Sequence, residues 1–297
     1  MEPTSSPAPE WQKRALRVAG FAFGLACFGG AIWVAVRERE EFAQALEALR
    51  DPPVPAVVAV LASVAVGAFL SAVLFHILMR RFGNVPFWEM QALILSSTLA
   101  NYLPLKPGLV GRVAYHRLRH GIKAAHSVRT VVEAVGLSGS VSAMFLLGLA
   151  GCRALGIDGD WSLLAPSVLG VAAIDRRLRT LAQALFVRQI ELALWTLRYW
   201  AVFRLVGAPI DLEVAVVLGS ASVIATLVPF VSNGLGIREW VIGLLAPVVS
   251  HDELNFSQAV VGELVHRVME VAVMLPLGLV SLAVLVRYNR THPAPQS

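Results

Sequence analysis

The hydrophobic residues of this chain are gathered into long runs, and charged residues are concentrated in the short stretches between them. The clearly apolar runs are 18–36, 54–79, 127–150, 161–174, 181–206 and 257–286. A helix needs about 20 apolar residues to cross a bilayer, and most of these runs approach or exceed that length. The pattern predicts an all-α, polytopic membrane protein with about six spanning helices.

Two further apolar regions, 88–120 and 212–250, are interrupted by clusters of proline and glycine. Proline removes a backbone donor and glycine permits sharp turns, so polar backbone groups are freed at each break. At membrane depth such backbone is tolerated only where it is buried in protein or lines a wet cavity. Two ordinary kinked helices are the alternative. Because the breaks occupy matching places along the chain, we favour two re-entrant helical hairpins.

The distribution of arginine and lysine predicts the orientation, because cytoplasmic loops carry an excess of basic residues. With the N-terminus inside, Arg80 and Arg81 are also inside. Arg117 and Arg119 stay inside only if 88–120 enters the membrane and returns. The C-terminus is then cytoplasmic too, and the second hairpin enters from outside. We therefore expect a protein of the cytoplasmic (inner) membrane with both termini in the cytoplasm.

These elements predict one transmembrane domain, 13–290, built from two inverted halves, 13–152 and 158–290. The tails 1–12 and 291–297 are expected to be disordered, since they are mostly polar or proline-rich. In transporters, paired Pro/Gly-interrupted segments point to a substrate site near the bilayer midplane. The predicted hinge residues are Asn101, Pro104, Pro107, Gly108, Gly111, Pro229, Gly234 and Gly236.

The composition agrees, with 57% hydrophobic and 15% charged residues against about 25% charged in soluble domains. The net charge of +5 comes from bases in short loops, so no basic domain stands free to bind nucleic acid. Cys27 and Cys152 have no metal or disulfide spacing. No catalytic or cofactor motif occurs, so the sequence gives an enzyme no support and predicts no cofactor.

Charged residues beside the breaks are the candidate substrate-binding groups. Lys106 and Arg112 suit an anionic group such as a lipid phosphate, although Arg112 could instead belong to an interfacial basic loop. At the second break lie Asn233, Arg238 and Glu239. A charge at the bilayer centre costs about 2.5–3.5 kcal/mol on insertion scales, so it usually has a partner and a function. A local interfacial ion pair is the alternative.

The helices that follow the breaks add further polar positions. Glu263 and Arg267 are four residues apart and can pair on one helix face, and His266 could carry a proton along such a path. Glu133 follows the first break in the same way. A set of structural ion pairs is the alternative, and we prefer it for two residues of the run 181–206, Glu191 and Arg198.

The two breaks resemble the flippase-like membrane family typified by the transmembrane domain of lysylphosphatidylglycerol synthase, over about residues 12–290. The second break is similar to that family's Pro, Gly-Gly-x-Gly-x-Arg-Glu pattern, through Pro229 and Asn233-Gly234-Leu235-Gly236-Ile237-Arg238-Glu239. Further similar positions are Asn101, Pro104, Pro107-Gly108, Gly111, Thr130-Val131-Val132-Glu133, Arg267 and Pro276. The chain departs from the family at Gly111-Arg112, where Gly-Glu is common, and at Glu133-Ala134, where Glu-Arg is common.

The resemblance implies outward movement of an aminoacylated phospholipid, a polyprenyl-linked sugar or a hopanoid-type lipid. The departures hint at a different substrate. The soluble aminoacyl-transferase domain of the synthases has no counterpart in the sequence. A non-transporting partner of a lipid-synthesis enzyme and a lipid-modifying transferase remain the alternative functions.

Overall fold

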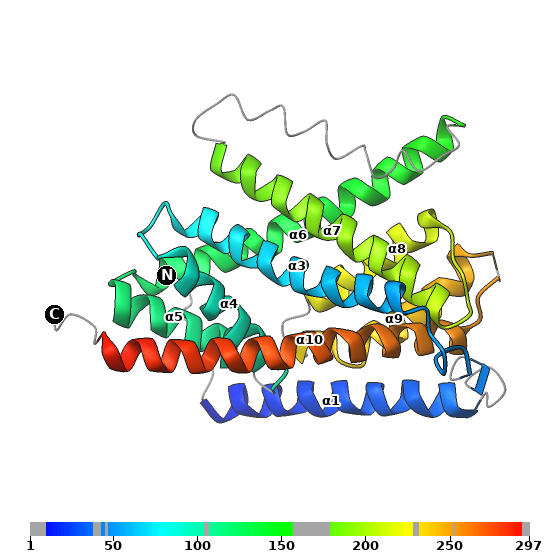
Figure 1. Cartoon of the computed structure of the whole chain (residues 1–297), viewed down its shortest axis with the longest axis horizontal. Coiled ribbons are helices and arrows are strands. Elements are labelled where there is room, and N and C mark those ends of the chain that lie inside the picture. Colours follow the sequence, from blue (N-terminus) through cyan, green and yellow to red (C-terminus); the bar gives the residue numbers. More distant parts are fainter. Residues whose placement is uncertain are drawn as a thin grey trace, which may run out of the picture.

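The computed structural model describes residues 10–37, 43–44, 47–103, 107–156, 179–227, 232–251 and 253–292. Every regular element within these ranges is helical, which confirms the all-α prediction (Figure 1). The long helices are α1 (Glu10–Arg37), α3 (Val54–Met79), α6 (Ala124–Ala154), α7 (Arg179–Leu205) and α10 (Phe256–Thr291). The shorter ones are α4 (Phe87–Ala100), α5 (Pro107–His120), α8 (Leu212–Thr226) and α9 (Ile237–Val249).

Three of these helices, α3, α6 and α10, are long and apolar enough to cross a membrane. Helix α7 has a comparable length of 27 residues, but its buried side chains include Gln189, Glu191 and Arg198, which make it more polar. Each predicted run from the described ranges lies within a helix or differs from it by a residue or two. The predicted run 161–174 lies outside the described residues. Helix α1 begins at Glu10, earlier than the predicted end of the N-terminal tail.

The long helices present large apolar side chains to their surroundings. On α3, Val58 and Phe69 are exposed, and on α10, Val268, Leu279 and Leu282 are exposed. Meanwhile Arg238, Glu239, Glu263 and His266 are fully buried elsewhere in the bundle. A water-soluble helix would bury its apolar face and expose its polar one. This reversed arrangement is what a lipid environment requires, since lipid tails solvate leucine well and charge poorly.

Both interrupted regions form pairs of short helices. In the first, Glu89 at the start of α4 accepts a hydrogen bond from Tyr115 at 2.9 Å and contacts His120, at the end of α5, at 2.9 Å. The start of α4 therefore lies beside the end of α5. In the second, Ile210 before α8 and Leu254 after α9 belong to one buried cluster. The α4–α5 and α8–α9 hairpins lie at opposite ends of the molecule (Figure 1).

The short helices of both hairpins pack against long helices of the bundle. Helices α3 and α7 pack against each other. Helix α4, the first arm of one hairpin, packs along α10, and α8, the first arm of the other, packs along α6. The first arm of each hairpin therefore packs along a long helix outside that hairpin.

Glycine is required where each hairpin approaches another backbone closely. A Cβ added to Gly108 would lie 1.8 Å from the carbonyl oxygen of Ser97, so α5 starts directly against α4. A Cβ added to Gly236 would lie 2.3 Å from the carbonyl oxygen of Gly24 on α1. Gly236 also has a φ of 82°, in the left-handed region that favours glycine. Both residues therefore act as close-contact positions.

The other predicted hinge residues have varied roles. Asn101 caps the C-terminal end of α4 and Pro107 is the first residue of α5, a position where proline is well tolerated. Gly234 has a φ of 69°. Gly111 lies within α5 and has open space beside it, so nothing in its surroundings requires glycine. Pro104 and Pro229 lie outside the described residues.

Candidate functional site

The second hairpin is joined to α10 by buried ion pairs. Arg238 on α9 is fully buried, and its guanidinium contacts Glu263 at 2.6 Å and Glu270 at 3.1 Å. The next residue, Glu239, contacts Arg267 of α10 at 2.6 Å. All five residues are on α9 and α10, which pack side by side. Each of the two helices therefore contributes both a cation and an anion to these ion pairs.

This pairing differs from the one that sequence spacing suggested. Glu263 and Arg267 are four residues apart on α10, yet each forms its ion pair with α9. Arg238 and Glu239 likewise pair with α10 and not with each other, so they do not form the local ion pair that was the alternative. The cause is the packing of α9 against α10. This packing brings a residue of opposite charge on α9 within ion-pair distance of Glu263 and of Arg267.

Neutral polar groups complete this network. The Nδ1 atom of His266 lies 2.9 Å from the guanidinium of Arg238, and Tyr199 of α7 donates a hydrogen bond to Glu263. Tyr102, which follows α4 in the first half, donates to Glu270 at 3.0 Å. Such additional bonds are needed because a buried ion pair alone seldom recovers the cost of leaving water. Tyr102 also connects the network to the first hairpin.

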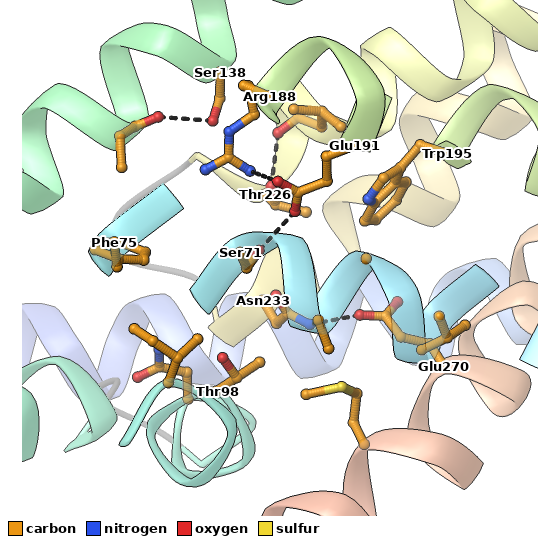
Figure 2. A pocket seen from close by; sticks show the side chains of 18 of the residues that line it. Ser71, Phe75, Thr98, Ser138, Arg188, Glu191, Trp195, Thr226, Asn233 and Glu270 are labelled. Carbon is orange, nitrogen blue, oxygen red and sulfur yellow. Dashed lines mark hydrogen bonds and ion pairs between the residues drawn. The ribbon is translucent and has the colours of Figure 1, made fainter. Parts of the chain in front are cut away.

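A cavity of about 310 Å³ lies among the helices of the bundle (Figure 2). It is bordered by α3, α4, α6, α7, α8 and α10, and by one asparagine beside each break, Asn101 and Asn233. Counted at about 30 Å³ per molecule, this space would hold roughly ten waters. Val135 of α6 lines the cavity and is 43% exposed.

The cavity has a polar wall and an apolar wall. On the polar side, Arg188 contacts Glu191 at 2.6 Å, and Ser71 donates to the same carboxylate at 2.7 Å (Figure 2). The amide of Asn233 lies 3.5 Å from Glu270, which belongs both to the cavity wall and to the buried network. The apolar side includes Val64, Ile94, Leu95, Val223 and Met274. The polar wall could contact the charged part of an amphipathic molecule, and the apolar wall could contact its apolar part.

Arg112 of the first hairpin is buried behind one wall of the cavity. It is 6% exposed, donates to Ser97 at 2.8 Å, and holds its guanidinium 4.3 Å from the ring centre of Phe75, which lines the cavity. Among the described residues, no carboxylate lies within ion-pair distance of Arg112. One turn further along α5, buried His116 contacts Ser127 at 3.0 Å. Arg112 is thus a buried cation and not part of an exposed basic loop.

The nine predicted substrate-binding residues fall into four groups. The structure brings six of them together around the second hairpin and α10: Asn233, Arg238, Glu239, Glu263, His266 and Arg267. Arg112 lies behind the cavity wall. Glu133 pairs with Arg81 and Arg129 and does not line the cavity. Lys106 lies outside the described residues.

Several cavity residues were not predicted as a site. Glu191 and Arg198 were expected to form a structural ion pair, but Glu191 pairs with Arg188, and Arg198 bonds to Ser63 at 3.0 Å. Both line the cavity. The signal was present, because Arg188, Glu191, Trp195 and Arg198 follow helical spacing on one face of α7. Serine and threonine residues of the wall give no comparable signal, since they are common in membrane helices.

Comparison of the sequence with models of known protein families and with curated proteins found no match. The resemblance at the two breaks therefore stays a prediction, and the function is argued from the geometry of the cavity and its surroundings.

Proposed function

We propose that this protein is an integral membrane transporter that moves a lipid from one leaflet to the other by passing its headgroup through the central cavity. The observation that carries the proposal is the cavity itself, which lies between two broken helical hairpins and combines buried charge with an apolar wall. Lipid headgroups are polar and lipid tails apolar, so both parts of a lipid find matching surroundings there. We assign the opening of the cavity to the side of Val135, which both lines the cavity and is exposed, so the lipid tails could remain in the bilayer there.

In this proposal the α4–α5 and α8–α9 hairpins are re-entrant. Helices α4 and α5 have 14 residues each, about 21 Å at 1.5 Å per residue, which is less than the roughly 30 Å of the hydrocarbon core. The contact between Glu89 and His120 brings the end of α5 beside the start of α4, as a re-entrant hairpin requires. Helix α4 packs along α10, and α8 packs along α6. The first arm of each hairpin thus packs against the last long helix of the other proposed half, which supports an inverted repeat.

The basic residues support one cytoplasmic side. Arg80 and Arg81 at the end of α3 line a common pocket with Arg179 at the start of α7. Arg119 at the end of α5 contacts His292 at the end of α10. The positive-inside rule assigns these groups to the cytoplasm. They lie at the ends of α3, α5 and α10 and at the start of α7.

The electrostatics of the cavity favour a headgroup that carries negative charge. Arg188 and Glu191 neutralise each other, whereas Arg112 has no carboxylate partner within the described part of the chain. A phosphate in the cavity would be attracted by that unneutralised cation through the intervening Phe75 ring. The carboxylate of Glu191, meanwhile, could receive an amine or a sugar hydroxyl of the same headgroup.

Transport of fluorescent reporter lipids in proteoliposomes tests the proposal. We expect the wild-type protein to move an anionic reporter faster than protein-free vesicles. Arg188→Gln should slow that movement by about tenfold, or about 1.4 kcal/mol, because Glu191 would lose its cationic partner and leave an unpaired negative charge in the cavity wall. Arg204→Gln is the matched control, because Arg204 is an exposed arginine on the same helix. Equal rates in wild type, Arg188→Gln and protein-free vesicles would contradict transport. Co-purification of a lipid-synthesis enzyme would then favour the partner-subunit alternative.

A further inference from the structure

A second hollow, of about 400 Å³, lies between the end of α3 and the start of α7. Its walls are formed by Ile77, Arg80, Arg81, Arg179, Thr180 and Gln183. None of these residues lines the central cavity. Ile77 is in the last turn of α3, Arg80 and Arg81 directly follow that helix, and Arg179 and Gln183 share one face of α7. We refer to these six residues as the basic pocket.

The charge of the basic pocket is strongly one-sided. None of its six residues is acidic, and three are arginines. Arg81 is already engaged, because it contacts Glu133 and donates to the carbonyl of Leu78 at 3.1 Å. Arg80 and Arg179 have no carboxylate within ion-pair distance in the parts of the chain that the structure covers. A concave surface lined by one sign of charge concentrates counter-ions, so two guanidinium groups are available to an anion.

The position of the basic pocket points to a lipid. Arg80 directly follows Met79, the last residue of an apolar helix long enough to cross a membrane. Trp88, in the first turn of α4, is 78% exposed, and tryptophan is enriched at the boundary between membrane and water. In the proposed orientation this end of α3 is cytoplasmic, where anionic lipids contribute negative surface charge and basic pockets between helices bind their headgroups.

We propose that the basic pocket binds the phosphate group of an anionic lipid from the cytoplasmic leaflet, at a site separate from the transport cavity. Arg80 and Arg179 hold the phosphate oxygens, because guanidinium groups match phosphate in both charge and planar donor geometry. Thr180 and Gln183 offer neutral donors beside them. The bound lipid would join α3 to α7, the two long helices that pack against each other.

Calorimetric titration of the purified full-length protein in an uncharged detergent tests this site. The probe is soluble dioctanoyl phosphatidylglycerol, with dioctanoyl phosphatidylcholine as the zwitterionic comparison. We expect the anionic lipid to bind more tightly, with an affinity that falls as salt is raised. In the double variant Arg80→Gln/Arg179→Gln the affinity should fall by at least about tenfold. The control Arg117→Gln/Arg287→Gln removes the same charge from exposed positions outside the pocket and should retain binding.

The remaining outcomes are equally decisive. Competition by inorganic phosphate at the same concentration as the lipid would identify a soluble phosphate compound as the ligand, with the chemistry of the site unchanged. Weak competition would identify the lipid. Equal losses in the two double variants, or none in either, would overturn the site. Because the basic pocket shares no residue with the central cavity, that result would leave the transport proposal untouched.

Discussion

The two hairpins differ in how they neutralise buried charge. In the α8–α9 hairpin, Arg238 and Glu239 both have ion-pair partners on α10 at 3.1 Å or less. In the α4–α5 hairpin, Arg112 is almost as deeply buried, but its described partners are the hydroxyl of Ser97 and the ring of Phe75. Two breaks in matching places thus have different electrostatic roles. The second hairpin is joined to α10 by ion pairs, whereas the first holds a buried cation without a carboxylate partner among the described residues.

This comparison is sharpest when the two arginines are changed in the same way. We predict that Arg238→Gln lowers the free energy of unfolding by about 3–5 kcal/mol, because Glu263 and Glu270 lose a buried cationic partner. Thermal unfolding in detergent, followed by gel filtration of the soluble fraction, measures the effect. Arg112→Gln should leave the unfolding temperature within a few degrees of wild type. Equal destabilisation by both changes would remove the distinction between the hairpins.

Alanine substitutions at two hairpin glycines should differ in their effect on stability, by less than the two arginine substitutions do. Gly236→Ala should destabilise the protein by about 1–3 kcal/mol, since its Cβ would overlap the backbone of α1 and its φ is unfavourable for alanine. Gly111→Ala should be neutral or stabilising by up to about 1 kcal/mol, because the site is helical and open. The same unfolding assay measures both. Tolerance of alanine at Gly236 would show that α1 does not approach the second hairpin as closely as described.

Arg112 itself should act on transport more than on stability. We expect Arg112→Gln to reduce movement of an anionic reporter by about tenfold, or about 1.4 kcal/mol, and to leave a zwitterionic reporter nearly unchanged. The measurement is the ratio of the two rates in the same proteoliposomes, which cancels differences in the amount of folded protein. An unchanged ratio would mean that the cation behind Phe75 has no part in substrate selection.

The smallest predicted effect concerns Glu89, at the base of the first hairpin. Burial alone would raise the pKa of its carboxyl, but hydrogen bonds from Tyr115, Tyr288 and His120, with the charge of His120, lower that pKa below its ordinary value. A lowered pKa contributes stability above the ordinary glutamate pKa and loses it as pH falls through the folded value. The difference in stability between wild type and Glu89→Gln should therefore shrink on acidification below about pH 5. A constant difference would contradict this assignment.

The all-helical class and the positions of the described helices were largely predictable, because apolar length and proline placement are local properties. The run 54–79 coincides with α3, and the two breaks separate α4 from α5 and α8 from α9. The ion pairs were not predictable, since Arg238 and Glu263 lie on different helices and meet only through the register of α9 against α10. The burial of Arg112 was also not predictable, because sequence spacing could not distinguish this residue from the basic residues at the end of α5.

The most direct test of the account asks whether lipid passes through the cavity between the hairpins. Two nearby valines of α6 provide the comparison: Val135 lines the cavity at its proposed opening, and Val132 is 63% exposed and does not line the cavity. The measurement is the rate of anionic reporter movement in proteoliposomes containing Val135→Trp or Val132→Trp protein. The account predicts that tryptophan at 135 blocks movement and tryptophan at 132 leaves it at the wild-type rate. Wild-type movement in both variants would contradict a route through this cavity.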